Sequence, residues 1–165
     1  MSKMAPIGVS TYSRLDHLRR TVDALRKNTL AKQSDLYIFS DAPKAGDEDK
    51  VNAVRKYAHS IDGFNAVHVL ERKTNSRVSN CRGGIEELLD KHGRMIFLED
   101  DVLAAPGFLQ FMNDALEFYK HDPRIGSVSA YCPPIKIPNK YRSDVFALTR
   151  FNPWDVRQLR SKPIS

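Results

Sequence analysis

The chain has 165 residues, of which 41% are hydrophobic and 28% are charged, and its formal net charge is +6 at pH 7. This length and composition are typical of one globular domain with a core of its own. The apolar runs are far shorter than the roughly 20 residues that a transmembrane helix needs, which argues against a membrane-spanning class. The positive charge favours anionic partners, although basic residues that solvate helix faces would give the same charge.

The start of the chain predicts a strand followed by a helix. Residues 7–12 form a short run typical of a strand. Ser13 is the predicted N-cap, and Asp16 three residues later completes a capping-box arrangement. The helix is predicted over residues 14–28, because apolar side chains recur at helical spacing at Leu15, Leu18, Val22 and Leu25.

Two further strands and the helix between them come next. The strands are predicted at residues 36–39 and 66–70. The helix opens at the acidic residues 47–49, which interact favourably with the positive end of a helix dipole. Strand and helix therefore continue to alternate.

A third helix is predicted over residues 77–91, and Gly93 is expected to end it. Two adjacent glycines, Gly83 and Gly84, lie inside this helix. Each costs about 1 kcal/mol relative to alanine in a helix interior. We interpret them as a sign that the helix approaches a sheet or a ligand closely, with a poorly formed first turn as the alternative.

The rest of the chain predicts one helix and two strands. The helix begins near Pro106, and its core candidates are Phe108, Leu109, Met112, Leu116 and Tyr119. The strands are predicted at residues 125–131 and 145–151. Alternation of this kind builds a mostly parallel sheet flanked by helices, a three-layer α/β/α arrangement. Ligands of such sheets bind at the carboxyl ends of the strands.

Residues 95–98 form an apolar run that ends in three consecutive carboxylates, Glu99, Asp100 and Asp101. Four large apolar residues suit a strand buried on both faces. Adjacent carboxylates repel one another, and their burial without a cation would cost several kcal/mol. Divalent ions such as Mg²⁺ and Mn²⁺ typically combine one or two carboxylates with phosphate oxygens and water. The run predicts a metal–diphosphate site, with a solvated acidic corner as the alternative.

Side chains alternate between the two faces of a strand. If the strand extends through the acidic run, Glu99 and Asp101 face one way and Asp100 faces the other. The three carboxylates are therefore not expected to bind one ion together.

The ordered set of polar segments resembles the GT-A glycosyltransferases, especially the inverting family 2 enzymes and the N-acetylglucosaminyltransferase I type. The matching features are the first strand with Thr11-Tyr12-Ser13-Arg14 at its end, Asp41 after the second strand, the Arg77/Asn80 segment, and Glu99-Asp100-Asp101 as the counterpart of the DxD motif. They cover about residues 5–132 in the family's order. The resemblance implies the GT-A, or nucleotide-diphospho-sugar transferase, fold.

The resemblance implies that the ends of the first two strands hold the nucleoside. Asp41 can accept a hydrogen bond from a uracil N–H, Tyr12 can lie against the base, and Thr11 can form a hydrogen bond to it. The alternative for Asp41 is a turn residue in Ser-Asp-Ala-Pro. For Thr11 and Tyr12 the alternative is ordinary packing at a strand end.

For the metal and the sugar, the resemblance implies roles for the acidic run. Asp101 is the implied ligand of Mn²⁺ or Mg²⁺, while Asp100 or Glu99 would contact sugar or ribose hydroxyls. The ion would neutralise the charge that develops on the departing diphosphate.

For the diphosphate, the resemblance implies basic and amide side chains. Arg77 and Asn80 open a helix whose N-terminus favours anions, and Arg77 could contact the diphosphate or brace the acidic run. Arg14 is a further donor-binding candidate. The alternatives are an exposed surface position for Arg77 and a place on the first helical turn for Arg14.

The implied reaction moves a sugar from a nucleotide-diphosphate donor, expected to be a UDP-sugar, to a hydroxyl of a saccharide or lipid-linked acceptor in polysaccharide or glycan assembly. An inverting enzyme also needs a general base, which in these families lies downstream of the donor half. Residues 151–154 resemble the start of the acceptor-side loop, but residues 155–165 do not continue it. We therefore expect a nucleotide-sugar-binding domain over residues 1–151, an atypical tail over 152–165, and a truncated chain whose catalytic base is absent.

Two other functions stay open. One is a domain that binds a nucleotide-sugar without transfer. The other is a nucleotidyltransferase, which would need a glycine-rich loop and a lysine after the first strand, and residues 12–15 supply neither.

The remaining expectations concern thiols, partners and location. Cys81 and Cys132 match no zinc spacing, so we expect two free thiols in a cytoplasmic protein. No nucleic-acid-binding motif is present, and we expect no nucleic-acid partner. Peripheral association with the inner face of a membrane and the oligomeric state stay open.

Overall fold

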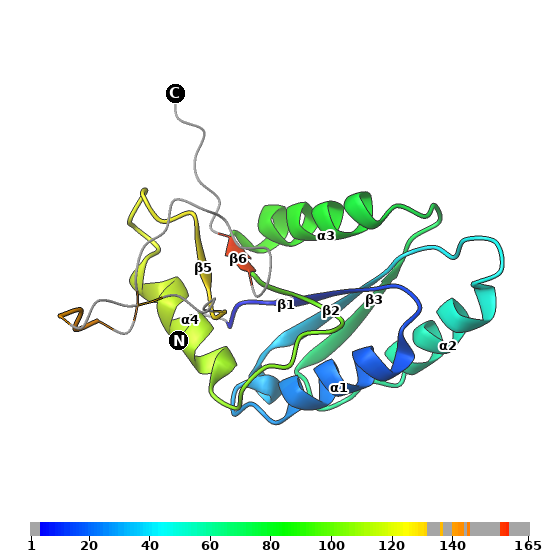
Figure 1. Cartoon of the computed structure of the whole chain (residues 1–165), viewed down its shortest axis with the longest axis horizontal. Coiled ribbons are helices and arrows are strands. Elements are labelled where there is room, and N and C mark those ends of the chain that lie inside the picture. The colour runs from blue at the N-terminus through cyan, green and yellow to red at the C-terminus, as the bar shows by residue number, and fades with distance from the viewer. Residues whose placement is uncertain (1–3, 132–135, 137–139, 144, 146–155, 159–165) are drawn as a thin grey trace.

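The computed structural model describes residues 4–131, 136, 140–143, 145 and 156–158. Within this part of the chain, six strands form one sheet in the order β3-β2-β1-β4-β6-β5 (Figure 1). The strands are β1 (Ile7–Thr11), β2 (Asp35–Ser40), β3 (Ala66–Glu71), β4 (Ile96–Glu99), β5 (Ser127–Ser129) and β6 (Val156–Gln158). The helices are α1 (Leu15–Arg26), a short 3₁₀ helix (Ala31–Gln33), α2 (Glu48–Ala58), α3 (Arg77–His92) and α4 (Phe108–Phe118).

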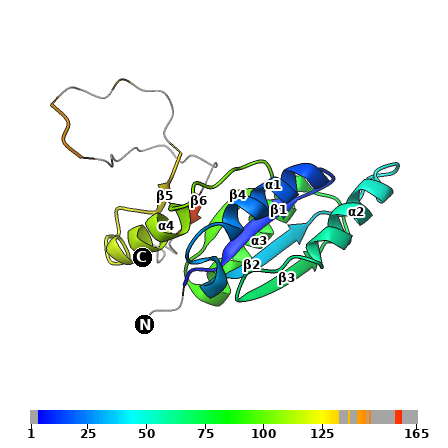
Figure 2. The same cartoon turned by 90° about the horizontal axis from the view of Figure 1, so that it is seen from below.

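The sheet is mostly parallel, as the alternation of strands and helices predicts. Strand β1 lies at its centre and pairs in parallel with both β2 and β4, so that Ile7 is opposite Leu36 and Ile96. Strand β3 extends the parallel part beyond β2. Helices α1 and α2 cover one face of this part, and α3 covers the other (Figures 1 and 2). The three-layer α/β/α arrangement is confirmed.

The core has two parts, one on each face of the sheet. Because side chains alternate along a strand, Ile38 packs into the part that includes α1, α2 and α4, whereas Tyr37 and Phe39 pack towards α3. Among the core candidates of α4, four are buried: Phe108, Leu109, Met112 and Leu116. Tyr119 lies at the C-cap of α4 instead.

The predicted end of α3 at Gly93 is confirmed, whereas the predicted N-cap of α1 is not. Gly93 ends α3 in a left-handed conformation with φ 72°, which glycine adopts without strain. The predicted capping box of Ser13 and Asp16 is wrong. Arg14 occupies the N-cap of α1, and no side chain caps that helix. The guanidinium of Arg14 instead contacts Asp100, 86 residues away.

The last third of the chain departs most from the prediction. Strand β5 spans Ser127–Ser129 only, shorter than the predicted 125–131. The strand predicted over 145–151 lies outside the described residues except for Val145, which is not in a strand. Strand β6, which the sequence did not predict, lies within the 152–165 segment and pairs antiparallel with both β4 and β5.

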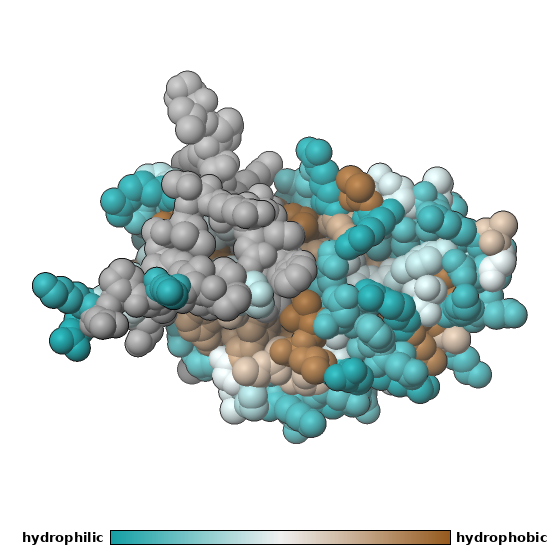
Figure 3. All heavy atoms as spheres, viewed as in Figure 1, coloured by the Kyte–Doolittle hydropathy of each residue, from teal (hydrophilic) through white to brown (hydrophobic). Residues whose placement is uncertain are grey.

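Hydrophilic residues predominate on the described part of the face in Figure 3. No helix in this part of the chain combines the length and the apolar character that crossing a bilayer requires.

The two glycines of α3 have different surroundings. A Cβ atom at Gly84 would lie 2.8 Å from the ring of Phe39 on β2, so this glycine allows the helix to approach the sheet. A Cβ atom at Gly83 would meet nothing closer than 3.8 Å. Close approach to the sheet, one of the two predicted reasons for the pair, therefore applies to Gly84.

This difference predicts opposite effects of alanine at the two positions. Gly83→Ala should raise the free energy of unfolding by about 1 kcal/mol, because alanine is the better helix former. Gly84→Ala should lower the free energy of unfolding. Overpacking against Phe39 costs about 1–3 kcal/mol, which outweighs the gain from the higher helix propensity of alanine. Urea unfolding of both variants measures the difference. Equal effects of the two substitutions would contradict the close contact.

Candidate functional site

A cleft of about 460 Å³ opens at the carboxyl edge of the parallel strands. It is lined by residues at or after the ends of β1, β2 and β4 and by residues at the start of α3. All of the residues singled out in the sequence line this one cleft: Thr11, Tyr12, Arg14, Asp41, Arg77, Asn80, Glu99, Asp100 and Asp101. They converge because the carboxyl ends of parallel strands meet at the same edge of a sheet.

Asp100 is the most constrained acid of the cleft. It is 3% exposed, and its Oδ2 accepts a hydrogen bond of 2.8 Å from the Thr11 hydroxyl at the end of β1. Its Oδ1 pairs with the guanidinium of Arg14, and its main-chain oxygen accepts a bond of 2.8 Å from the Thr21 hydroxyl on α1. Through its side chain and its main-chain oxygen, Asp100 therefore ties the turn after β4 to β1 and α1.

Arg14 bridges two of the three acids. Besides Asp100, its Nη2 contacts Oδ2 of Asp101 at 3.1 Å. Partial burial lowers the pKa of Arg14, but the two carboxylates outweigh it and raise the pKa above its usual value. The side chain of Asp101 remains 39% exposed, so it faces the cleft with an arginine on one side.

The predicted alternation of the three carboxylates assumed a strand through the acidic run, and this condition is not met. Glu99 is the last residue of β4, and Asp100 and Asp101 lie in the turn that follows. Asp101 therefore shares Arg14 with Asp100, while Glu99 pairs with Arg77 of α3 at 3.3 Å. Strand geometry cannot order side chains beyond the last strand residue.

Asp41 holds the loop between β3 and α3 in place. It is 4% exposed, and its Oδ1 accepts bonds from the main-chain N–H of Ala42 at 2.9 Å and of Ser76 at 3.1 Å. Its Oδ2 accepts a longer bond of 3.3 Å from the Asn75 side chain. The weakly engaged Oδ2 keeps capacity to accept another hydrogen bond.

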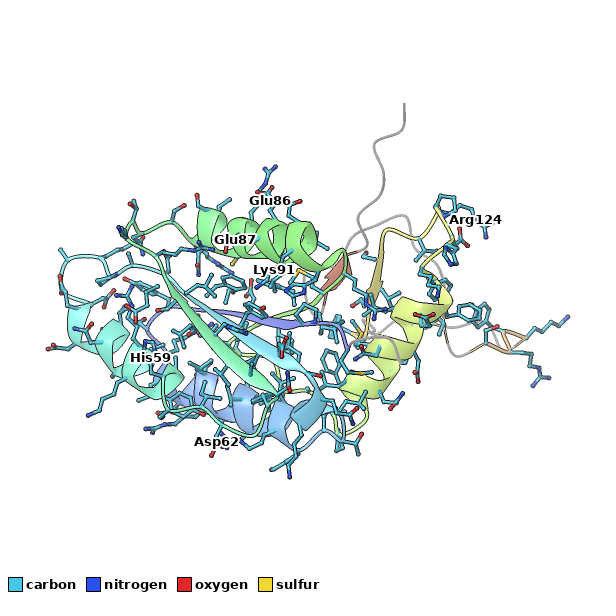
Figure 4. All side chains as sticks on the ribbon, turned by 180° about the vertical axis from the view of Figure 1, so that it is seen from behind. His59, Asp62, Glu86, Glu87, Lys91 and Arg124 are labelled. Carbon is cyan, nitrogen blue, oxygen red and sulfur yellow. The ribbon has the colours of Figure 1, made fainter. Side chains whose placement is uncertain are left out.

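Asn80 fixes the start of α3 to the sheet. Its Nδ2 donates to the main-chain oxygen of Phe39 at 2.9 Å, and its Oδ1 accepts from Nε of Arg72 at 3.2 Å. Arg72 also pairs with Glu87 at 2.7 Å, which Figure 4 labels on α3. Because both ends of its amide are engaged and it is 3% exposed, Asn80 positions the wall of the cleft.

Tyr12 links the first two strand ends. Its hydroxyl donates to Oδ2 of Asp47 at 2.9 Å and accepts from the main-chain N–H of Lys44 at 3.0 Å. The Lys44 bond lowers the pKa of Tyr12, but desolvation and Asp47 outweigh it and raise the pKa above its usual value. The tyrosine therefore stays protonated and holds the loop that leads to α2.

The cleft also contains residues that were not candidate site residues on sequence grounds, although Ser13 belongs to the Thr11-Tyr12-Ser13-Arg14 segment. Five more residues line it: Ser10, Ser13, Lys44, Asn75 and Cys81. Lys44 and Asn75 follow the second and third strands, so a search of every strand-end loop would have found them. The Cys81 thiol donates to the Ser10 hydroxyl at 3.3 Å, and burial raises its pKa, so it is a protonated side chain of the cleft wall.

Arg55 supports the site from outside the cleft. This arginine of α2 donates through Nη2 to the main-chain oxygens of Asp41 at 3.3 Å and of Arg72 at 3.0 Å. It therefore connects the ends of β2 and β3. No local sequence signal marks this role, because it depends on how α2 packs beside the sheet.

The acidic corner fits a divalent ion as a single-carboxylate site. Within the described residues, no three side chains of His, Cys, Asp or Glu gather around one point. Asp100 is enclosed by Thr11 and Arg14, and Glu99 is less exposed than Asp101, at 24% against 39%, so Asp101 is the most accessible oxygen ligand of the three. One carboxylate is sufficient when phosphate oxygens and water complete the coordination of the ion.

No protein-family model matches the sequence, and no curated protein matches it. Solved structures do. A mannosyltransferase from Pyrobaculum calidifontis, solved with GDP-Man and Mn²⁺, matches 79% of this chain and 36% of its own, at 17% identity and a TM-score of 0.56.

The TarS protein of S. aureus matches as well. A structure of TarS residues 1–349 matches at 15% identity and a TM-score of 0.52. The match covers 81% of this chain and 38% of the TarS chain. A second TarS structure matches 82% of this chain and 23% of that chain, at 16% identity and a TM-score of 0.51. The chain thus spans about a quarter to two fifths of these proteins. Identities this low show a shared fold, and this chain has a glycosyltransferase fold.

Proposed function

We propose that this chain carries the donor-binding site of a metal-dependent, inverting glycosyltransferase of the GT-A type. The donor is a nucleotide-diphosphate sugar, in the simplest case a UDP-sugar, and the acceptor is a hydroxyl of a saccharide or of a lipid-linked sugar. The observation that carries the proposal is the convergence of Asp41, two arginines and Asp101 in one cleft at the carboxyl edge of the sheet. These groups suit a base, a diphosphate and a dication, respectively.

The nucleoside end of the cleft is proposed to lie at the ends of β1 and β2. A carboxylate can only accept hydrogen bonds, so Oδ2 of Asp41 suits the N3–H of uracil. The ring of Tyr12, held through its hydroxyl by Asp47 and Lys44, offers a flat apolar surface for the base. Thr11 lines the cleft between them and the acidic corner.

The diphosphate end is proposed to lie between the acidic corner and α3. Arg14, Lys44 and Arg77 bring positive charge to this part of the cleft. The first turn of α3 contains no acidic residue, so its N-terminus also favours an anion. The side chain of Arg77 is 82% exposed and paired only at 3.3 Å, so it can turn to a phosphate at little cost.

Asp101 is proposed to hold Mn²⁺ or Mg²⁺ together with the diphosphate oxygens. The ion would act as a Lewis acid on the leaving diphosphate. Glu99 and Asp100 are proposed to face sugar or ribose hydroxyls, with Asp100 mainly holding Arg14 and the end of β1. The Mn²⁺ in the structure of the Pyrobaculum mannosyltransferase supports a dication in this fold. The general base is left unassigned.

Calorimetry of UDP binding tests the metal assignment. In the presence of Mn²⁺ the wild-type chain should bind UDP at least about tenfold more tightly than without it, because the ion bridges Asp101 and the diphosphate. Asp101→Asn should remove this metal dependence and leave the weaker, metal-free binding. A UDP affinity that is the same with and without Mn²⁺, and the same in wild type and Asp101→Asn, would contradict the assignment.

Base selectivity tests the role of Asp41. The wild-type chain should prefer UDP to CDP, because N3 of cytosine carries no proton to donate to a carboxylate. Asp41→Asn should lose most of this preference, since the amide can also donate. The matched control is Asp35→Asn, which changes a buried aspartate at the opposite end of β2. An unchanged ratio of UDP to CDP affinity in a folded Asp41→Asn variant would exclude Asp41 from base recognition.

A further inference from the structure

The acidic corner of the cleft already contains its own counter-cations. Arg77 pairs with Glu99, and Arg14 pairs with both Asp100 and Asp101. Among the described residues, Arg14 is the ion-pair partner that the structure gives to Asp101. The carboxylate that suits a dication is therefore neutralised by an arginine when no ligand is bound.

The two acids that share Arg14 differ in accessibility. The side chain of Asp100 is 4% exposed and also accepts the Thr11 hydroxyl, so its link to Arg14 is enclosed. The side chain of Asp101 is 39% exposed, and that of Arg14 is 48% exposed. The contact between Arg14 and Asp101 therefore lies at the cleft surface, where a ligand can replace it.

We propose that Arg14 is an exchangeable counter-cation, which neutralises Asp101 in the ligand-free protein and transfers to the donor diphosphate when a dication takes its place. This inference rests on the proposed function. A dication beside Asp101 repels a guanidinium that contacts the same carboxylate. A diphosphate supplies enough negative charge to accommodate both cations, so Arg14 then has a new partner.

The geometry favours this exchange for Arg14 over Arg77. Arg77 contacts Glu99, whereas Arg14 contacts Asp101 directly. A guanidinium carries five N–H donors, so Arg14 can keep its bond to the enclosed Asp100 while it turns other donors to a phosphate. Asp100 thus keeps Arg14 within reach of the diphosphate.

The exchange makes the dication and the nucleotide bind cooperatively. A dication alone must compete with Arg14, so it binds weakly. Once the nucleotide engages Arg14, Asp101 is released for the ion, and by linkage the ion strengthens nucleotide binding by the same factor. Substitution of Arg14 should therefore affect the two ligands in opposite directions.

The test measures Mn²⁺ binding by paramagnetic resonance of the free ion, with and without UDP, and UDP binding by calorimetry in saturating Mn²⁺. Arg14→Gln should bind Mn²⁺ alone about tenfold more tightly than wild type, because the competing charge is gone. The same variant should bind UDP in saturating Mn²⁺ about tenfold more weakly, because a charged phosphate contact is lost. The control is Arg19→Gln, which removes an equal charge from an exposed pair with Asp16 on the same helix.

Thermal unfolding of each variant checks that the fold is intact. Arg14→Lys provides a second variant if Arg14→Gln does not fold. It keeps a charge for Asp100 but has a shorter side chain with one ammonium, so its affinity for Mn²⁺ alone should lie between those of wild type and the value expected for Arg14→Gln.

Two failures are distinguishable. If wild type binds UDP with Mn²⁺ but neither Arg14 variant tightens the binding of Mn²⁺ alone, the exchange is wrong and the proposed function stands. The exchange is equally wrong if Arg19→Gln tightens Mn²⁺ binding as much as Arg14→Gln does. If wild type binds no UDP even with Mn²⁺, the proposed function fails and the exchange fails with it.

Discussion

A buried carboxylate in the turn after β4 organises the cleft. Asp100 is joined to a distant part of the sequence, because it contacts Thr11 at the end of β1, Arg14 before α1 and Thr21 within α1. An enclosed carboxylate without these partners would be strongly destabilising. The bonds therefore fix the turn after β4, and they leave the next residue, Asp101, at the surface of the cleft. Asp101 is accessible because the contacts of the enclosed Asp100 hold the turn in this conformation.

A second set of polar contacts shapes the opposite wall of the cleft. Asp41 accepts the main-chain N–H of Ser76, and Asn80 binds the main-chain oxygen of Phe39, so the start of α3 is attached to the end of β2. Arg55 connects the ends of β2 and β3 from behind. Fixed strand ends keep Arg77 opposite the acidic corner, and the separation of the two walls gives the cleft its volume of about 460 Å³, which is the space that we propose for a diphosphate with its ion.

Sequence reasoning predicted the features that depend on local pattern. The parallel sheet, the end of α3 at Gly93 and the gathering of strand-end residues in one cleft follow from periodicity and topology. Features set by distant contacts were not predictable. Arg14 displaced the capping box because its guanidinium binds Asp100, and the partner of Asp101 depends on a turn after the strand. Strand β6 has three residues, too few for a periodic pattern, and it forms through pairing with β4 and β5.

The most direct test of this account is a crystal structure of the chain with UDP and Mn²⁺, in which anomalous scattering locates the metal. The account predicts manganese bound by Asp101 and by both phosphates, with the uracil ring at Asp41 and with Arg14 in contact with the diphosphate. Manganese located away from Asp101, or a nucleotide bound outside the cleft between β1, β4 and α3, would contradict it.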